Sequence, residues 1–321
     1  MGKANEEDVR AHGGTEGIVV GVDGSPGSRA ALDWAARAAA DRGLELLVLH
    51  ALSMPVISAP LGFTGRVPPT PELADWAERL LREAVDHVAR TRPGLGTRTE
   101  VSKLDPARAL LAASRSAGMA VVGSRGLGGT ASVFLGSVSV RVSAHATCPV
   151  AVVPGPDEAV GGGEHRVRGE RGRVVVGLDG SAGGQAALRF ALDEAARTGA
   201  ELVAVHAWEV PNPVDVTALD PAAHTAVREY LVSRADEHVR ALVEEGRSER
   251  TGDVPVRVEV VQDQAAHALL TRGDDADLIV VGSRGRGGFA GLLLGSVSQT
   301  VLHHARVPVV VARSRPGRSE D

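Results

Sequence analysis

Short apolar runs alternate with longer amphipathic segments along the first half of the chain. The runs are rich in branched aliphatic side chains, which is typical of strands that are covered on both faces. The longer segments carry apolar side chains at helical spacing, and one of them stops at Gly43, a residue that commonly ends a helix. The predicted strands are 18–22, 44–50, 97–103, 119–122 and 148–153, and the predicted helices are 28–42, 71–92, 107–116 and 138–145.

The same alternation returns in the second half. It passes through strands near Val174, Leu202, Val256, Leu278 and Val307. Strands that alternate with helices of ten or more residues predict a parallel, doubly wound sheet, so each half is expected to form one α/β domain with five strands. Residues 54–70 fit neither pattern, and we expect an irregular connection that is either a lid over a site or a surface excursion.

The two halves are repeats in sequence. The block from Ile18 to Leu52 matches Val174 to Trp208, and VVGSRGLGGTASVFLGSVS from Val121 matches VVGSRGRGGFAGLLLGSVS from Val280. Such a repeat indicates tandem copies of one unit. The predicted divisions are a disordered tail (1–16), a first domain (17–153), a Gly- and Pro-rich linker (154–172), a second domain (173–312) and a tail (313–321). The fifth strands, apolar and at the sheet edges, are expected to pair between the copies, giving an intramolecular pseudo-dimer; a homodimer is also possible.

Composition narrows the function classes. The chain is 43% hydrophobic and 23% charged with a net charge of −5, and no Lys/Arg run is interleaved with aromatic residues, so no nucleic-acid partner is expected. No apolar stretch reaches the ~18 residues of a membrane span. The first residues lack the apolar core of a signal peptide, so we expect a cytoplasmic protein. The single cysteine, Cys148, excludes an internal disulfide.

Paired glycine loops carry the candidate chemistry. In the first copy the fourth strand runs into Gly123-Ser124-Arg125-Gly126, and nine residues later Gly136-Ser137 opens a helix; the second copy repeats this with Gly282-Ser283-Arg284-Gly285 and Gly295-Ser296. Glycines allow positive φ angles and a close approach of backbone to ligand. Helix N-termini and arginines favour anions. Both copies therefore predict a phosphate site at the carboxyl ends of the strands.

The pattern G-x2-G-x9-G-S, together with V-D-G-S or L-D-G-S after the first strand, resembles the universal stress protein family in its tandem, ATP-binding form. The resemblance implies strand order 3-2-1-4-5 and an ATP held across the first and fourth strand ends. It assigns the phosphates to Gly123, Gly126, Gly136, Ser137, Gly282, Gly285, Gly295 and Ser296. It assigns the adenosine end to Gly21, Asp23, Ala51, Gly177, Asp179 and Ala207. Neighbours of these loops complete the candidate set: Ser124, Arg125, Val138, Ser139, Ser283, Arg284, Val297 and Ser298.

Two interpretations remain open for Asp23 and Asp179. A carboxylate beside a triphosphate is repelled unless a metal intervenes, which favours a place for Asp23 and Asp179 at the sugar or base end. Alternatively, they cap the helix that follows, because Asp-Gly-Ser is good turn chemistry.

Rival nucleotide folds fit less well. A P-loop needs a lysine in its glycine loop, and the two lysines, Lys3 and Lys103, lie elsewhere. A dinucleotide site requires its G-x-G-x-x-A loop after the first strand. The matches to this pattern at 126–131 and 285–290 follow the fourth strand instead. We therefore expect a stress-response or signalling protein that binds one ATP per domain, with Mg²⁺ but no protein metal site, and that turns ATP over slowly or not at all. The alternative is a slow ATPase or nucleotidyl-transfer enzyme.

Overall fold

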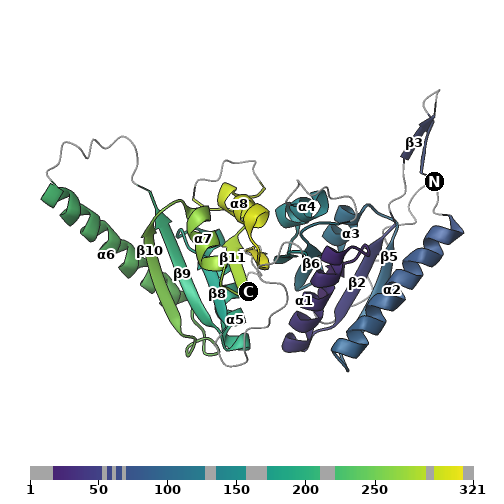
Figure 1. Ribbon diagram of the computed structural model, residues 1–321, viewed down its shortest axis with the longest axis horizontal. Helices are drawn as coiled ribbons and strands as arrows, with labels where there is room; N and C mark the ends of the chain where they lie inside the picture. Colours follow the sequence, from purple (N-terminus) through teal and green to yellow (C-terminus); the bar gives the residue numbers. More distant parts are fainter. Residues whose placement is uncertain are drawn as a thin grey trace, which may run out of the picture.

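Two α/β domains lie side by side in the computed structural model, which describes residues 17–52, 56–59, 63–66, 70–126, 135–156, 172–209, 221–286 and 293–313 (Figure 1). The first domain contains β1 (Ile18–Gly21), α1 (Pro26–Arg42), β2 (Leu46–Ala51), β3 (Val56–Ala59), β4 (Phe63–Arg66), α2 (Pro71–Thr91), β5 (Thr97–Ser102), α3 (Pro106–Ala113), β6 (Met119–Gly123), α4 (Ser137–His145) and β7 (Val150–Val153). The second contains β8 (Arg173–Gly177), α5 (Ala182–Thr198), β9 (Glu201–Trp208), α6 (Pro221–Gly246), β10 (Val256–Gln262), α7 (Ala265–Gly273), β11 (Leu278–Gly282), α8 (Ser296–His304) and β12 (Val309–Ala312).

The main strands join in one ten-stranded sheet, in the order β10-β9-β8-β11-β12-β7-β6-β1-β2-β5. Within each domain the strands of this sheet pair in parallel. Numbered along the chain within each domain, they stand in the order 3-2-1-4-5, as the resemblance implied. The two halves of the sheet meet where β7 and β12 pair antiparallel, with Ala151 opposite Val310. The predicted pairing of the fifth strands is therefore present.

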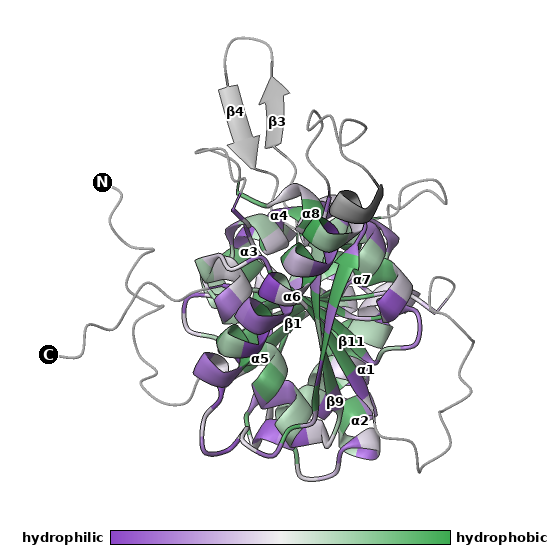
Figure 2. Ribbon diagram, turned by 90° about the vertical axis from the view of Figure 1, so that its left-hand side faces the viewer, coloured by the Kyte–Doolittle hydropathy of each residue, from purple (hydrophilic) through white to green (hydrophobic). Residues whose placement is uncertain are grey.

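Helices cover both faces of the sheet, and alternate strand residues fill two cores. One core packs α1, α2, α5 and α6 against side chains such as Val20 and Val176. The other packs α3, α4, α7 and α8 against neighbours that point the opposite way, such as Val19 and Val175. Figure 2, viewed along the long axis, shows the hydrophobic strands enclosed by these helices. None of the helices in the described ranges is long and apolar enough to cross a membrane.

Local chemistry explains where the helices begin and end. Gly43 ends α1 with φ 62°, as the sequence predicted. The same helix begins at Pro26, two residues before the predicted start, because Ser25 caps it and accepts a hydrogen bond from the Ser28 N–H.

The predicted helix 71–92 is present as α2, and its apolar residues are buried only in part, since Leu73 is 49% and Trp76 37% exposed. Its 21 residues span roughly 32 Å, whereas the six residues of β5 span roughly 20 Å, so the first turns of α2 extend past the sheet. The expected irregular connection contains an antiparallel pair, β3 with β4. The predicted tails and most of the predicted linker lie outside the described residues.

Candidate functional site

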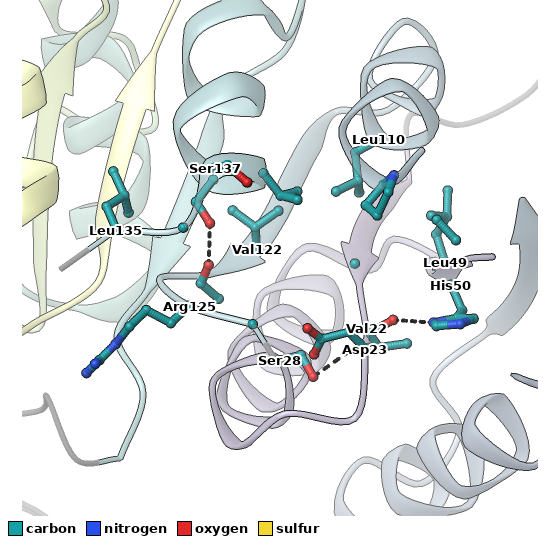
Figure 3. A pocket seen from close by; sticks show the side chains of 18 residues that line it. Val22, Asp23, Ser28, Leu49, His50, Leu110, Val122, Arg125, Leu135 and Ser137 are labelled. Atoms are coloured by element: carbon teal, nitrogen blue, oxygen red, sulfur yellow. Dashed lines mark hydrogen bonds between the residues drawn. The ribbon is translucent and has the colours of Figure 1, made fainter. Parts of the chain in front are cut away.

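In each domain a cavity lies at the carboxyl ends of the first, second and fourth strands. In the first domain it measures about 420 Å³ and in the second about 410 Å³. In both, the central strand pairs with strands on opposite sides that lead into helices on opposite faces, which makes this the switch point where open α/β sheets bind ligands. Both volumes fall in the ~300–1,000 Å³ range of small-molecule sites. Figure 3 shows the first cavity, with Ser137 on one side and His50 on the other.

Nearly all the predicted residues line these cavities. The first is lined by Gly21, Asp23, Ala51, Gly123, Arg125, Gly126, Gly136, Ser137, Val138 and Ser139. The second is lined by Gly177, Asp179, Ala207, Gly282, Arg284, Gly285, Gly295, Ser296, Val297 and Ser298. Ser124 and Ser283 are absent from the linings because both are buried behind the loop, where their backbones bond to the fifth strand and to the glycine before α4 or α8.

The loop glycines serve three different purposes. The first is close packing, in which Gly123 and Gly282 let the fourth strand of each domain contact its first helix. A Cβ on Gly123 would lie 2.7 Å from the carbonyl carbon and oxygen of Gly27, and one on Gly282 would meet Gly183 in the same way. These glycines therefore let the first helix approach the fourth strand. The described loop glycines do not use their access to positive φ, because the positive-φ glycines among the described residues lie elsewhere.

Gly126 and Gly285 make room for the aspartates. A Cβ on either would collide with Oδ2 of Asp23 or Asp179. Asp179 Oδ2 accepts the Arg286 N–H at 2.9 Å, and its Oδ1 accepts the N–H and the hydroxyl of Ser181 at 3.0 and 2.6 Å. Burial raises the pKa of Asp179, but these hydrogen bonds outweigh it and hold the pKa below its usual value. The carboxylate thus fastens the first turn to the glycine loop.

The aspartates are not the helix caps that one interpretation proposed. Asp23 Oδ1 accepts the Ser25 N–H at 2.9 Å, and Ser25 itself is the N-cap of α1. Ser181 has the same place before α5. Asp23 and Asp179 instead accept the backbone N–H of these cap serines, in the turn before each helix. Each aspartate also lines its cavity.

Gly136 and Gly295 are less closely packed than the other loop glycines by the residues that the structure describes. A Cβ on Gly295 would find its nearest described neighbour at 3.5 Å, an ordinary contact, and one on Gly136 would lie 3.3 Å from the Ser124 carbonyl oxygen, which is tight but avoids the direct collision that a Cβ on Gly123 would make. Their φ angles of −72° and −74° suit any residue. Both are N-caps that provide no side-chain hydrogen bond, unlike the serine caps of α1 and α5. The N-termini of α4 and α8 are therefore left uncapped where they face the cavities.

Some polar groups at the start of α4 already form hydrogen bonds within the protein, and others precede the first backbone hydrogen bond of the helix. The Gly136 N–H donates to the Ser124 carbonyl at 2.7 Å, and the Ser139 hydroxyl donates to the Gly123 carbonyl at 2.6 Å. Ser298 repeats the second contact with Gly282 at 2.6 Å. The first backbone bond within the helix is from Val140 N–H to Gly136, so the N–H groups of residues 137–139 precede it. At this described helix start, these three amides remain as candidate anion donors, whereas the Gly136 N–H and the Ser139 hydroxyl are already engaged.

Arg125 does not extend into the site. Figure 3 shows its guanidinium pointing outward from the cavity. Its backbone, together with that of the glycine loop, forms the wall instead. The prediction that this side chain partners a phosphate is therefore not met by its orientation here.

At the opposite end of the first cavity, sequence reasoning named Gly21, Asp23 and Ala51 but not the residues beside them. His50 is 5% exposed; its Nδ1 donates to the Val22 carbonyl at 2.7 Å and its ring meets Trp76 edge-on at 5.2 Å. Leu49, Pro106 and Leu110 add apolar surface. The recurrence of a histidine at the end of the second strand was a usable signal, whereas the residues from α3 gave none.

Comparison with known proteins identifies relatives of the whole chain. The model of the universal stress protein family matches residues 15–154 and again 170–313. A universal stress protein of Mycolicibacterium smegmatis is 38% identical over 309 residues, covering 93% of this chain and 97% of the relative. One from Mycobacterium tuberculosis is 39% identical over 311 residues, covering 92% and 97%. The crystal structure of a universal stress protein from Archaeoglobus fulgidus shares the fold with a TM-score of 0.63 at 22% identity, covering 94% of this chain and 98% of that one.

Proposed function

The chain belongs to the universal stress protein family, and we propose that each of its two domains holds one ATP as a bound ligand in a stress-response or signalling role. The observation that carries the proposal is the pair of uncapped helix N-termini, α4 and α8, which face cavities of nucleotide size.

The phosphate end of each site is built from backbone. The amides of residues 137–139 and 296–298 supply N–H donors and the positive end of a helix dipole. The absent Cβ at Gly136 and Gly295 leaves open the space that a phosphate would take. Because no described residue comes closer than 3.5 Å to a Cβ on Gly295, a ligand is the physical reason we propose for that glycine and for Gly136 at the equivalent place in the repeat.

The base end is more apolar. In the first cavity Leu49, Ala51 and Leu110 provide surface for a base, and Asp23 lies near them as an acceptor for sugar hydroxyls. Ala207 and Leu269 take the corresponding places in the second. Mg²⁺ would accompany the triphosphate and be held mainly by phosphate oxygens, as is usual for this ion.

We propose that ATP is retained rather than rapidly hydrolysed. The carboxylate in the first cavity is engaged with the Ser25 N–H, and the one in the second accepts three hydrogen bonds. Neither is presented as a base for an attacking water. The alternative, a slow ATPase or nucleotidyl-transfer enzyme, differs in predicting a turnover that depends on the cavity.

Calorimetric titration of the purified chain with Mg·ATP tests the proposal. We expect two nucleotides per chain, micromolar or tighter binding, a preference over NAD, and turnover far below the ~10 s⁻¹ median of enzymes. An absence of ATP binding, or tighter binding of NAD, would refute it. Turnover of several per second would favour the alternative.

A further inference from the structure

The two cavities differ in one charged residue beside the glycine loop. Arg286 lines the second cavity, and its sequence equivalent in the first copy is Leu127. The rest of each loop, at 127–134 and 287–292, is without charged residues. The repeat therefore preserves the glycines and serines but not the charge next to them.

Arg286 is held at the wall of the second cavity. Its N–H donates to Asp179 Oδ2 at 2.9 Å, which fixes its backbone. Its guanidinium rests over the β8–α5 turn, where a Cβ added to Gly180 would lie 2.9 Å from Nη2 and 3.4 Å from His238 Nε2. Among the residues that the structure describes, no carboxylate forms an ion pair with this guanidinium.

The charge balance of the two linings follows from this difference. Asp23 and Arg125 are the charged residues of the first lining in the described ranges, and the Arg125 guanidinium points outward from that cavity. The second lining holds Asp179 with Arg284 and Arg286, one arginine more than the first. Arg286 is exposed, so its attraction to nearby phosphate charge is screened by salt.

We propose that Arg286 makes the second site the one that discriminates nucleotides by the number of their phosphates. The inference rests on the proposed function and adds a division of labour: the second site selects triphosphate over monophosphate, and the first site selects less. The flexible stem of Arg286 lets its head group turn from Gly180 toward the phosphate chain. The additional phosphates of ATP gain this contact, and the base and sugar do not.

The experiment isolates each site and replaces Arg286. We expect Gly136→Asp to empty the first site and Gly295→Asp the second, since aspartate fills the missing Cβ position and suits a helix N-cap. Affinities for Mg·ATP and AMP are then measured by calorimetry at each remaining site. Arg286→Leu installs the first-copy residue, Arg286→Lys keeps the charge, and Arg189→Leu removes an exposed arginine of α5 that lines neither cavity.

We expect the ratio of AMP to ATP dissociation constants to be about tenfold larger at the second site. Arg286→Leu should reduce that ratio to the first-site value, Arg286→Lys should keep most of it, and Arg189→Leu should keep all of it. Salt should reduce the wild-type ratio more than that of Arg286→Leu.

Equal ratios at the two wild-type sites, or an unchanged ratio in Arg286→Leu, would overturn the inference while leaving two ATP sites in place. An Arg286→Leu variant that loses ATP and AMP affinity equally would also overturn it, because the arginine would then serve the loop and not the phosphates. If neither site binds ATP in the wild-type chain, the proposed function itself fails, and calorimetry separates that outcome from the others.

Discussion

Adding one methyl group to two glycines of the same site should separate packing from ligand binding. Gly282 and Gly295 both line the second cavity. A Cβ on Gly282 would lie 2.6 Å from the Gly183 carbonyl carbon, whereas one on Gly295 would find its nearest atom among the described residues, apart from its chain neighbours, at 3.5 Å. Gly282→Ala must therefore move the start of α5 away from β11, and overpacking of this kind costs about 1–3 kcal/mol.

Gly295→Ala should leave stability almost unchanged. Alanine is a poorer N-cap than glycine by roughly 0.5–1 kcal/mol. Replacing glycine at a φ of −72° stabilises the fold by about 0.4–1 kcal/mol, because alanine restricts the unfolded chain. The two effects offset each other to within about 0.5 kcal/mol, while the methyl group enters the space that we assign to a phosphate.

Urea unfolding followed by circular dichroism measures the first effect, and calorimetry with Mg·ATP measures the second. We expect Gly282→Ala to lower the unfolding midpoint. We expect Gly295→Ala to keep the midpoint and to weaken ATP binding at the second site at least tenfold, which corresponds to about 1.4 kcal/mol. Equal destabilisation by both variants would refute the packing argument. Unchanged ATP affinity in Gly295→Ala would refute the role of the open N-terminus.

Three further predictions follow from individual contacts. Ser298→Ala removes the 2.6 Å bond to the Gly282 carbonyl and should lower the free energy of unfolding by about 1–3 kcal/mol, measured in urea. Hydrogen bonds hold the pKa of Asp179 below its usual value, so the ionised carboxylate stabilises the fold at neutral pH, and this stabilisation is lost as the pH falls through the folded-state pKa. The difference in unfolding free energy between wild type and Asp179→Asn should therefore shrink below about pH 4. A constant difference down to about pH 2 would contradict this prediction. The Arg42–Glu194 ion pair joins α1 to α5 with both side chains 11% exposed, so Arg42→Ala should cost about 3 kcal/mol of unfolding free energy, and a joint Arg42→Met, Glu194→Leu replacement should recover most of it.

Much of the fold could be predicted because it is encoded locally. Apolar runs of four to six residues specify strands buried on both faces, and a glycine such as Gly43 ends its helix by its own conformation. The internal repeat fixed the location of both sites, since the glycine loops follow strands that lie at the centre of each domain.

The remaining features depend on contacts between distant parts of the chain. Gly123 and Gly136 look alike in sequence, but a Cβ on the first would collide with the backbone of Gly27 at 2.7 Å, whereas one on the second would lie 3.3 Å from its nearest described neighbour. The hydroxyl of Ser139, which looked like a ligand, is used by the Gly123 carbonyl. The outward direction of Arg125 likewise depends on tertiary structure (Figure 3). Sequence pattern identified the loops, and the packing around them decided what each residue does.

The central claim is that each domain holds its own nucleotide at an uncapped helix N-terminus. Counting ATP per chain by calorimetry in wild type, Gly136→Asp, Gly295→Asp and the double variant tests it most directly. Aspartate at these positions meets no strained backbone and provides a good N-cap, so circular dichroism should show an intact fold. We predict two, one, one and no nucleotides per chain. If Gly136→Asp alone empties both sites of the folded protein, or if the double variant still binds two, the account of two independent sites is contradicted.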